Sequence, residues 1–195
     1  MESLQRELSG AIEGVQGNED SRRYILSFSS ETPYERWFGP EILDHQSGSI
    51  DMSRLQEIGV VLYNHNRDDV IGKINRAWTE ESRGMVEIEF DRDDLSEKIY
   101  QKVKSGTLKG VSVGYKVDNF EEVGEGRKSS DMRFDGPCYV ARHWTPYEVS
   151  IVSVPADPTV GVGRSDEDAV PEITPDLYET MMRQYQYNLN GGRWL

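Results

Sequence analysis

The stretch VKSGTLKGVSVGYKV, residues 103–117, contains the two patterns that decide the fold class of this chain. Its beginning closes an apolar stripe of helical spacing, formed by Leu95, Ile99 and Val103. From Gly110 onward apolar residues alternate with others, which is the period of a β-strand. Gly106 lies between the two patterns, where glycine commonly ends a helix. The stretch therefore predicts a helix that ends at about Ser105, followed by a strand over residues 110–117.

Similar short strand patterns surround this stretch on both sides. They cover residues 22–28, 35–39, 60–63, 70–74, 85–90, 139–142 and 148–153. Internal helices are predicted over residues 52–58 and from a cap at Asp93 or Asp94. Residues 121–136 are rich in Gly, Ser and charge, and they predict an exposed flexible loop. Because strands outnumber helices, we expect a β-rich α+β fold: a single barrel-like β domain surrounded by a few helices.

The composition divides the chain into three segments. Residues 1–19 form an acidic amphipathic N-terminal segment, residues 20–163 the compact domain, and residues 164–195 an acidic C-terminal tail. The N-terminal segment predicts a short helix on Leu4, Leu8, Ile12 and Val15. Its glycines weaken that helix by about 1 kcal/mol each, so we expect it either to fray or to dock elsewhere. The tail predicts one last short helix on Leu177, Met181 and Tyr185.

Composition and charge argue against several classes of function. A formal net charge of −13 and an isoelectric point near 4.7 argue against direct nucleic-acid binding, which requires basic patches. A mean hydropathy of −0.68 and the lack of a long apolar run argue against a membrane span, and we expect no secretory signal. Cys138 is the only cysteine among the 195 residues, so no internal disulfide can form and a reducing, intracellular compartment fits.

His65 follows the buried strand at residues 60–63 and begins a polar turn at the rim of the predicted sheet. A histidine in such a place can serve as a general base, because imidazole exchanges its proton near neutral pH. It can also be a turn residue that caps backbone groups. A third role is that of a metal ligand beside Asp68 and Asp69. The local sequence leaves these roles open.

Ser112 and Glu148 are the residues that would complete a catalytic site with His65. Ser112 lies between Gly110 and Gly114, which leave room for another backbone or a substrate to approach its hydroxyl. A serine becomes a nucleophile when a neighbouring base takes its proton, so this role requires His65 close by. Glu148 begins a strand and can accept the second N–H of the histidine. Locally, Ser112 can equally be a small packing residue and Glu148 a solvated strand end.

Two further residues offer alternative chemistry. Cys138 can be the nucleophile of a cysteine peptidase, although it also suits a small buried hydrophobe. His143 can act as a second base. None of these signals is specific alone, because catalytic triads occur in several chain orders and spacing does not show which residues converge.

Three blocks taken together resemble the caudovirus prohead protease family. The first, at residues 61–74, contains VLYNH and VIGKI; the second, at residues 103–115, resembles the block with the family's nucleophile; the third, at residues 148–158, reads EVSIVSVPADP. The blocks stand in the family's order and spacing. The resemblance runs from about Arg22 to Val162, which is nearly the whole predicted domain.

The resemblance implies a fold shared with herpesvirus assemblin and a serine endopeptidase that works through an acyl-enzyme. Ser112 is then the nucleophile, His65 its base and Glu148 the orienting acid, in the place of a histidine in assemblin. No metal or organic cofactor is implied. Assemblin-type enzymes use arginines downstream of the third residue for the oxyanion, and none follows closely here. Backbone N–H groups, a water, Arg142 or Arg164 therefore stay open as oxyanion donors.

The resemblance also implies partners and a setting. The substrate would be the capsid scaffold, as an extension of the major capsid protein or a separate scaffold protein, and the enzyme would also cleave itself. It would act inside the immature phage prohead in the host cytoplasm, and a homodimer is a family-level expectation. No direct contact with nucleic acid or membrane is expected. The alternative is a non-enzymatic capsid assembly or scaffolding protein that retains the protease fold.

Overall fold

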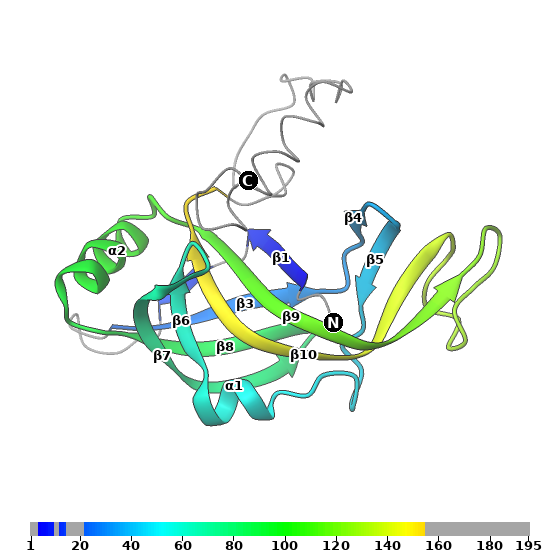
Figure 1. Cartoon of the computed structure of the whole chain (residues 1–195), viewed down its shortest axis with the longest axis horizontal. Helices are drawn as coiled ribbons and strands as arrows, with labels where there is room; N and C mark the ends of the chain where they lie inside the picture. Colours follow the sequence, from blue (N-terminus) through cyan, green and yellow to red (C-terminus); the bar gives the residue numbers. More distant parts are fainter. Residues whose placement is uncertain (1–3, 10–11, 15–21, 155–195) are drawn as a thin grey trace, which may run out of the picture. The chain divides into compact units, whose positions relative to one another are not determined.

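The computed structural model describes residues 4–9, 12–14 and 22–154 (Figure 1). The strands of this part are β1 (Leu4–Ser9), β2 (Ile12–Gly14), β3 (Arg23–Ser30), β4 (Tyr34–Arg36), β5 (Gly39–Leu43), β6 (Val60–Tyr63), β7 (Asn66–Glu80), β8 (Arg83–Phe90), β9 (Gly110–Val123) and β10 (Cys138–Val152). The helices are α1 (Ser53–Ile58) and α2 (Asp94–Lys104). Neither of these two helices has the length and apolar character needed to cross a membrane.

The ten strands belong to one sheet with the order β1-β9-β10-β6-β7-β8-β3-β2; β5 pairs with β10, and β4 pairs with β5. Most neighbours are antiparallel, whereas β10 runs parallel to both β5 and β6. The sheet curls into a half-barrel accompanied by few helices (Figure 1). This confirms the β-rich, barrel-like prediction, while the relationship to assemblin stays a prediction.

The main hydrophobic core gathers side chains from the strands and from both helices. Its largest fully buried members include Trp144, Tyr115 and Phe28. The Trp144 ring meets the Tyr115 ring edge-on at 5.6 Å and the Phe28 ring at 6.5 Å between centroids. Each such buried side chain contributes about 1.5–3 kcal/mol. The core thus fixes β9 and β10 against each other at the level of Tyr115 and Trp144.

Both predicted internal helices are confirmed, and α2 has the predicted cap. The Asp93 carboxylate accepts hydrogen bonds from the backbone N–H groups of Leu95 and Ser96 at 3.1 and 3.0 Å. Gly106 follows the helix with φ +74°, a left-handed conformation that suits glycine. These local signals are readable from the sequence because each involves residues only a few positions apart.

β10 joins two segments that the sequence predicts as separate strands, residues 139–142 and 148–153. The pairing register with β9 shifts near His143 and again between Pro146 and Glu148. Such irregularities interrupt the alternation of side chains along the strand. The sequence pattern therefore predicts two short strands with a break between them. A single long strand therefore carries both Glu148 and the polar cluster around Arg142.

The prediction of a helix within residues 1–19 is wrong for the parts that are described. Leu4–Ser9 is strand β1, which pairs with β9, and Ile12–Gly14 is strand β2, which pairs with β3. A short helix interrupted by glycine is marginal, whereas the edges of β9 and β3 offer rows of backbone hydrogen-bond partners. Of the two expected alternatives, fraying and docking elsewhere, the described parts of the segment adopt docking.

The prediction that Gly39 and Pro40 end a strand at residues 35–39 is also wrong. They begin β5, and β4 with β5 forms a hairpin in which Arg36 pairs with Gly39. Gly39 has φ +119°, which lets the chain reverse at this point. The glycine is therefore part of the turn into a strand.

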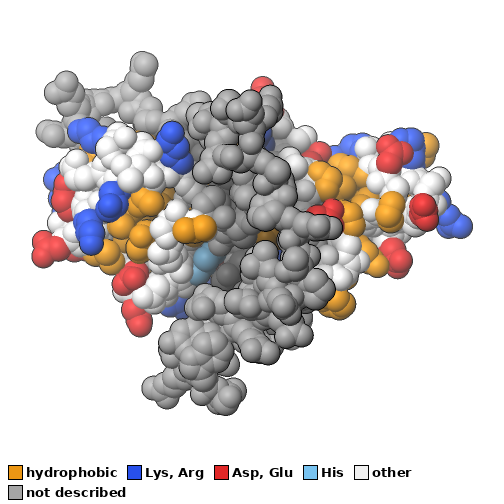
Figure 2. Space-filling view, turned by 90° about the horizontal axis from the view of Figure 1, so that it is seen from above, with side chains coloured by type: hydrophobic (Ala, Val, Ile, Leu, Met, Phe, Trp, Pro, Cys, Tyr) orange, Lys and Arg blue, Asp and Glu red, His pale blue; other side chains and the backbone are white. Residues whose placement is uncertain are grey.

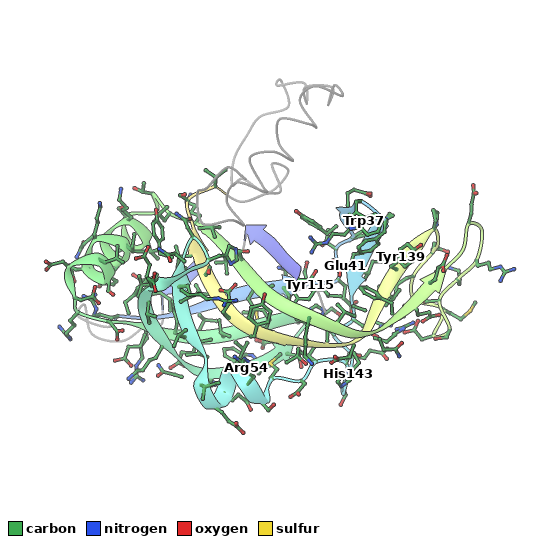
Figure 3. The ribbon with its side chains drawn as sticks, in the orientation of Figure 1. Trp37, Glu41, Arg54, Tyr115, Tyr139 and His143 are labelled. Carbon is green, nitrogen blue, oxygen red and sulfur yellow. The ribbon has the colours of Figure 1, made fainter. Side chains whose placement is uncertain are left out.

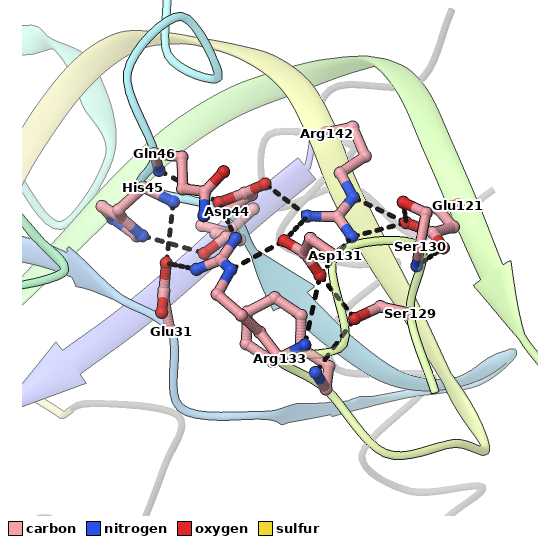
Figure 4. A network of polar contacts seen from close by, with 12 residues as sticks. Glu31, Asp44, His45, Gln46, Glu121, Ser129, Ser130, Asp131, Arg133 and Arg142 are labelled. Atoms are coloured by element: carbon pink, nitrogen blue, oxygen red, sulfur yellow. Dashed lines mark hydrogen bonds and ion pairs between the residues drawn. The ribbon is translucent and has the colours of Figure 1, made fainter. Parts of the chain in front are cut away.

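The loop predicted at residues 121–136 is more ordered than expected. β9 continues to Val123, and Ser129 is buried. Arg142 of β10 pairs with Asp44 at 2.6 Å and with Asp131 at 2.8 Å, and Arg133 pairs with Asp131 at 2.7 Å (Figure 4). Hydrogen bonds from Arg142 hold the pKa of Asp131 well below its usual range. This network ties the segment to β10 and to the end of β5.

A second buried ion pair lies between β4, β5 and β9. Glu41 is fully buried, and its Oε2 accepts hydrogen bonds from Arg36 Nε at 2.8 Å and from the Tyr115 hydroxyl at 2.6 Å. Figure 3 shows Glu41 and Tyr115 reaching toward each other from β5 and β9. A buried carboxylate is stable only with such partners, so these contacts fix the β4–β5 hairpin to β9.

Figure 2 shows side chains of both charge signs among the coloured residues at the two ends of the face that it draws. The predicted tail of residues 164–195, with its short helix on Leu177, Met181 and Tyr185, lies outside the described residues. The boundaries at residues 20 and 163 stay predictions.

Candidate active site

His65 occupies a two-residue turn between β6 and β7, in which Tyr63 pairs with Asn66. Asn64 and His65 have φ values of +50° and +58°, as in the turns that best suit tight hairpins. The backbone N–H of Asn64 donates to the carbonyl of Ile151 at 3.0 Å, and Asn64 Oδ1 accepts from the backbone N–H of Ser153 at 2.9 Å. These bonds attach the turn to β10 and aim the histidine from a rigid support.

His65 and Glu148 form the central contact of the site. Nδ1 of the imidazole lies 2.7 Å from Glu148 Oε1, although the two residues are 83 positions apart in the chain. The His65 and Glu148 side chains are 13% and 9% exposed, which protects the contact from water. A carboxylate accepts a hydrogen bond, so the proton of a neutral imidazole lies on Nδ1 and the lone pair lies on Nε2. The pair therefore prepares Nε2 to accept a proton.

Ser150 is a third member of this cluster, and the sequence reasoning did not assign it a role. Its hydroxyl donates to Glu148 Oε2 at 2.7 Å and accepts from the backbone N–H of His65 at 3.3 Å. The residue is fully buried. The alternation along β10 places Ser150 on the same face as Glu148, and this is the signal that could have found it. Both carboxylate oxygens of Glu148 are thus held, one by the histidine and one by the serine.

Ser112 lies on β9 directly opposite Ser150 of β10. Opposed residues of an antiparallel pair point to the same face of a sheet, so Ser112 shares the face that carries Ser150 and Glu148. Ser112 is fully buried within the chain. The register therefore places all three predicted residues in one region: Ser112 on β9, Glu148 on β10 and His65 at the end of β6.

Gly114 explains how the Glu148 carboxylate fits beside β9. The two residues are paired across the strands, and a Cβ built on Gly114 would lie 2.4 Å from Glu148 Oε1. That distance is far below a van der Waals contact, so a side chain at residue 114 would displace the carboxylate. The glycine predicted to give access to the Ser112 hydroxyl also makes room for the acid.

The other candidates lie elsewhere or are engaged. Arg142 is six positions from Glu148 along β10, about 20 Å at strand spacing, and three carboxylates already bind it. The arrangement therefore argues against Arg142 as an oxyanion donor, and Arg164 lies outside the described residues. Cys138 is buried ten positions before Glu148, and burial raises the pKa of its thiol, which disfavours a reactive thiolate. His143 is half exposed, with its Nδ1 3.5 Å from Asp118.

The acidic residues after His65 do not assemble a metal site. Asp68 is exposed and Asp69 is half-buried, and Asp69 accepts a hydrogen bond from the Asn66 amide at 2.9 Å. Among the described residues, no three His, Cys, Asp or Glu side chains gather closely enough to hold a metal ion. The contacts of His65 instead place it with a carboxylate and a serine.

Comparisons with known proteins match the part of the chain that contains this cluster. The family model described as "Caudovirus prohead serine protease" matches residues 16–170. The major capsid protein of Halomonas phage phiHAP-1 is 37% identical over 153 residues, which is 76% of this chain and 24% of that protein. The capsid polyprotein of Pseudomonas phage PAJU2 is 26% identical over 103 residues, 49% of this chain and 14% of that protein.

The chain thus spans about a quarter of the first of these relatives and less of the second. No solved structure matches the chain. The matched family region contains all three predicted site residues, His65, Ser112 and Glu148.

Proposed function

This chain belongs to the caudovirus prohead serine protease family, and on that premise we propose that it is a serine endopeptidase acting in phage capsid maturation. Ser112 is the nucleophile, His65 the general base and Glu148 the acid that orients the histidine. The observation that carries this proposal is the 2.7 Å contact between His65 Nδ1 and Glu148 Oε1. It supports the imidazole tautomer that a serine nucleophile requires.

The proposed reaction proceeds in two stages. Ser112 Oγ attacks the carbonyl carbon of the scissile peptide bond while His65 Nε2 takes the hydroxyl proton. The same nitrogen gives the proton to the leaving amine, so an acyl group remains on Ser112. A water, activated by His65, then hydrolyses the ester and frees the carboxylate product. Glu148 stabilises the imidazolium that forms at each stage, and Ser150 holds the carboxylate in place.

The proposed substrate is a capsid polypeptide. Two relatives carry the names major capsid protein and capsid polyprotein, and each is much longer than the stretch it shares with this chain. We therefore place the cleavage in capsid or scaffold segments, in the same polypeptide or in a separate one, inside the prohead. Self-cleavage and a homodimer belong to the same proposal.

The test is co-expression of the chain with its capsid protein, as wild type and as Ser112→Ala, followed by mass spectrometry of both polypeptides. Loss of a triad nucleophile costs about a million-fold in rate, so cleavage is expected to vanish. Cys138→Ala is the matched control, because it also truncates a small buried side chain to alanine. This variant is expected to cleave like the wild type. Cleavage that persists in Ser112→Ala and stops in Cys138→Ala would reject the serine mechanism.

A second candidate is a non-enzymatic capsid assembly protein that retains the protease fold. The names of the two relatives favour it, since both are capsid proteins by name. In that case Ser112→Ala would support prohead assembly as well as the wild type does, and neither form would cut the capsid polypeptide.

A further inference from the structure

Strand β1 lies directly beside the segment of β9 that carries the proposed nucleophile. The pairing is antiparallel and runs from Leu4 opposite Tyr115 to Ser9 opposite Gly110. In this register Glu7 is paired with Ser112. The N-terminal segment of the chain thus covers the stretch around Ser112 along its full length (Figure 1).

The other edge of the same segment is occupied by β10. Residues Gly110–Tyr115 pair with β10 from Pro146 to Val152, which includes Glu148 and Ser150. A peptide that joins the sheet beside Ser112 can therefore do so only at the edge that β1 occupies. An extended peptide that adds to a sheet edge is a common mode of recognition, because its main chain supplies the hydrogen bonds.

The sequence of β1 is a poor strand former. LQRELS has no β-branched or aromatic residue, and Leu, Gln, Arg and Glu favour helices. The same residues give the helical spacing that predicts a helix in this segment. By contrast, Gly110–Val117 contains three valines and a tyrosine. The pairing of β1 thus depends on the edge that β9 offers more than on the strand propensity of β1, as expected of an occupant that can be replaced.

We propose that the β9 edge at Gly110–Tyr115 is the binding site for an extended peptide substrate, and that β1 occupies it as an intramolecular competitor. This rests on the proposed function, because it assigns the substrate to the strand of Ser112. A tethered segment acts at an effective concentration in the millimolar range. A dilute peptide therefore loses to β1, whereas a substrate held at high local concentration, as in an assembled shell, displaces it.

The test uses the full chain with Ser112→Ala, so that binding is measured without turnover. Two single variants are compared in this background, Arg6→Pro and Glu7→Pro. Successive N–H groups of a strand point to opposite sides, so one proline removes a donor to β9 and its neighbour removes a donor that faces away. The variant that loses a donor to β9 is expected to raise amide hydrogen exchange over residues 110–115 at least 10-fold. The variant that loses a donor facing away from β9 is expected to leave this exchange unchanged. Equal exchange in both variants and the parent would overturn the occupancy by β1.

The probe for the vacated edge is a synthetic peptide of residues 1–14. It is expected to bind the released variant at least 10-fold more tightly than the parent and to restore protection over residues 110–115. Equal affinity for both, or protection that appears elsewhere, would overturn the proposal. If the disrupting proline prevents folding, the double variant Arg6→Gly, Leu8→Gly weakens the strand without removing a donor, and the same contrast is expected.

These readouts separate the two proposals. Exchange and peptide binding are measured in the Ser112→Ala chain. These measurements therefore test the occupancy of the β9 edge even if the wild type proves to have no peptidase activity. Conversely, a wild type that cleaves capsid polypeptide while β1 variants show no exchange contrast supports the protease and rejects β1 as the occupant. In the active chain, release of β1 is expected to lower KM for a dilute peptide at least 10-fold and to leave kcat unchanged.

Discussion

The Ser150 hydroxyl donates a 2.7 Å hydrogen bond to Glu148, on the carboxylate oxygen that does not face His65. Glu148 is therefore held from two sides, and its orientation does not depend on the histidine alone. A hydrogen bond to a charged group contributes about 1.5–3 kcal/mol. The consequence is that Ser150, though outside the proposed triad, positions the carboxylate of the proposed acid.

Ser150→Ala is expected to lower kcat about 10- to 100-fold with little change in KM, since it frees the carboxylate without touching the substrate. The measurement is the rate of capsid-polypeptide cleavage. Ser129→Ala is the control, because it removes an equally buried hydroxyl that binds Asp131 at 2.6 Å, away from the site. Similar kcat losses in both variants would show that Ser150 acts only through stability.

Glu148→Gln is expected to reduce kcat by about 10⁴, the size of effect seen when a triad carboxylate becomes an amide. The amide can donate as well as accept, so it no longer enforces the Nδ1–H tautomer of His65. The rate is measured under single-turnover conditions. Glu122→Gln changes an exposed glutamate of β9 and is expected to retain wild-type activity. A Glu148→Gln enzyme within 10-fold of the wild type would exclude an orienting role.

Gly114→Ala is expected to lower activity at least 100-fold while the chain stays folded. The added Cβ would meet Glu148 Oε1 at 2.4 Å and Tyr147 Cε2 at 2.7 Å, so the carboxylate must move away from the histidine. Misplacement by about 1 Å costs about 10² in rate, whereas crowding costs about 1–3 kcal/mol of stability. Gly124→Ala, where the nearest atom is Arg127 Cδ at 3.8 Å, is the control for both assays. Full activity in Gly114→Ala would contradict the placement of the Glu148 carboxylate against β9.

Arg36→Met is expected to destabilise the fold by about 3–5 kcal/mol, because it leaves the fully buried Glu41 carboxylate without its cation. Urea unfolding measures the loss. Arg23→Met removes a surface pair with Glu89 and is expected to cost no more than about 1 kcal/mol. Adding Glu41→Gln to Arg36→Met should recover part of the loss. Equal losses in the two single variants would mean that burial does not decide the strength of these pairs.

Asp131→Asn tests the network around Arg142 through its pH dependence. The folded-state pKa of Asp131 is held below the unfolded value of about 3.9, so ionised Asp131 stabilises the fold above that pH. This stabilisation is lost as the pH falls through the folded-state pKa. Thermal unfolding is expected to show that the variant is less stable than the wild type at pH 6 and that this difference shrinks toward pH 2.

The control for this prediction is Asp135→Asn, an exposed residue of the same segment that pairs with Lys128. It is expected to change stability little at either pH. A constant difference between Asp131→Asn and the wild type at all pH values would contradict the role of the ionised carboxylate.

The parts of the fold that the sequence predicted are those with local causes. The Asp93 cap, the end of α2 at Gly106 and the alternation in β8 each depend on residues within one element. The strand β1 could not be predicted this way, since its own residues favour a helix and its pairing depends on β9, about 100 positions away. Long-range pairing overrode local propensity there.

The candidate site shows the same division. The sequence identified His65, Ser112 and Glu148 by residue type and strand position, but only the resemblance to a family grouped them. The hydrogen bond of His65 joins residues 83 positions apart, and no periodic pattern reports such a contact. For Ser150, the sequence offers only a weak indication of its role, which is its position two residues after Glu148. For the ion pairs of Arg142, the sequence offers no indication, because the charges of residues 121–136 predict an exposed loop.

The left-handed turn at Asn64 and His65 has a consequence for how this protein can change over generations. Glycine is the preferred second residue of such a turn, and another side chain there costs about 1 kcal/mol or more. A glycine at residue 65 would relieve this backbone cost, but it would also remove the imidazole that the proposed function requires. Stability and the proposed chemistry therefore make opposite demands on this one residue.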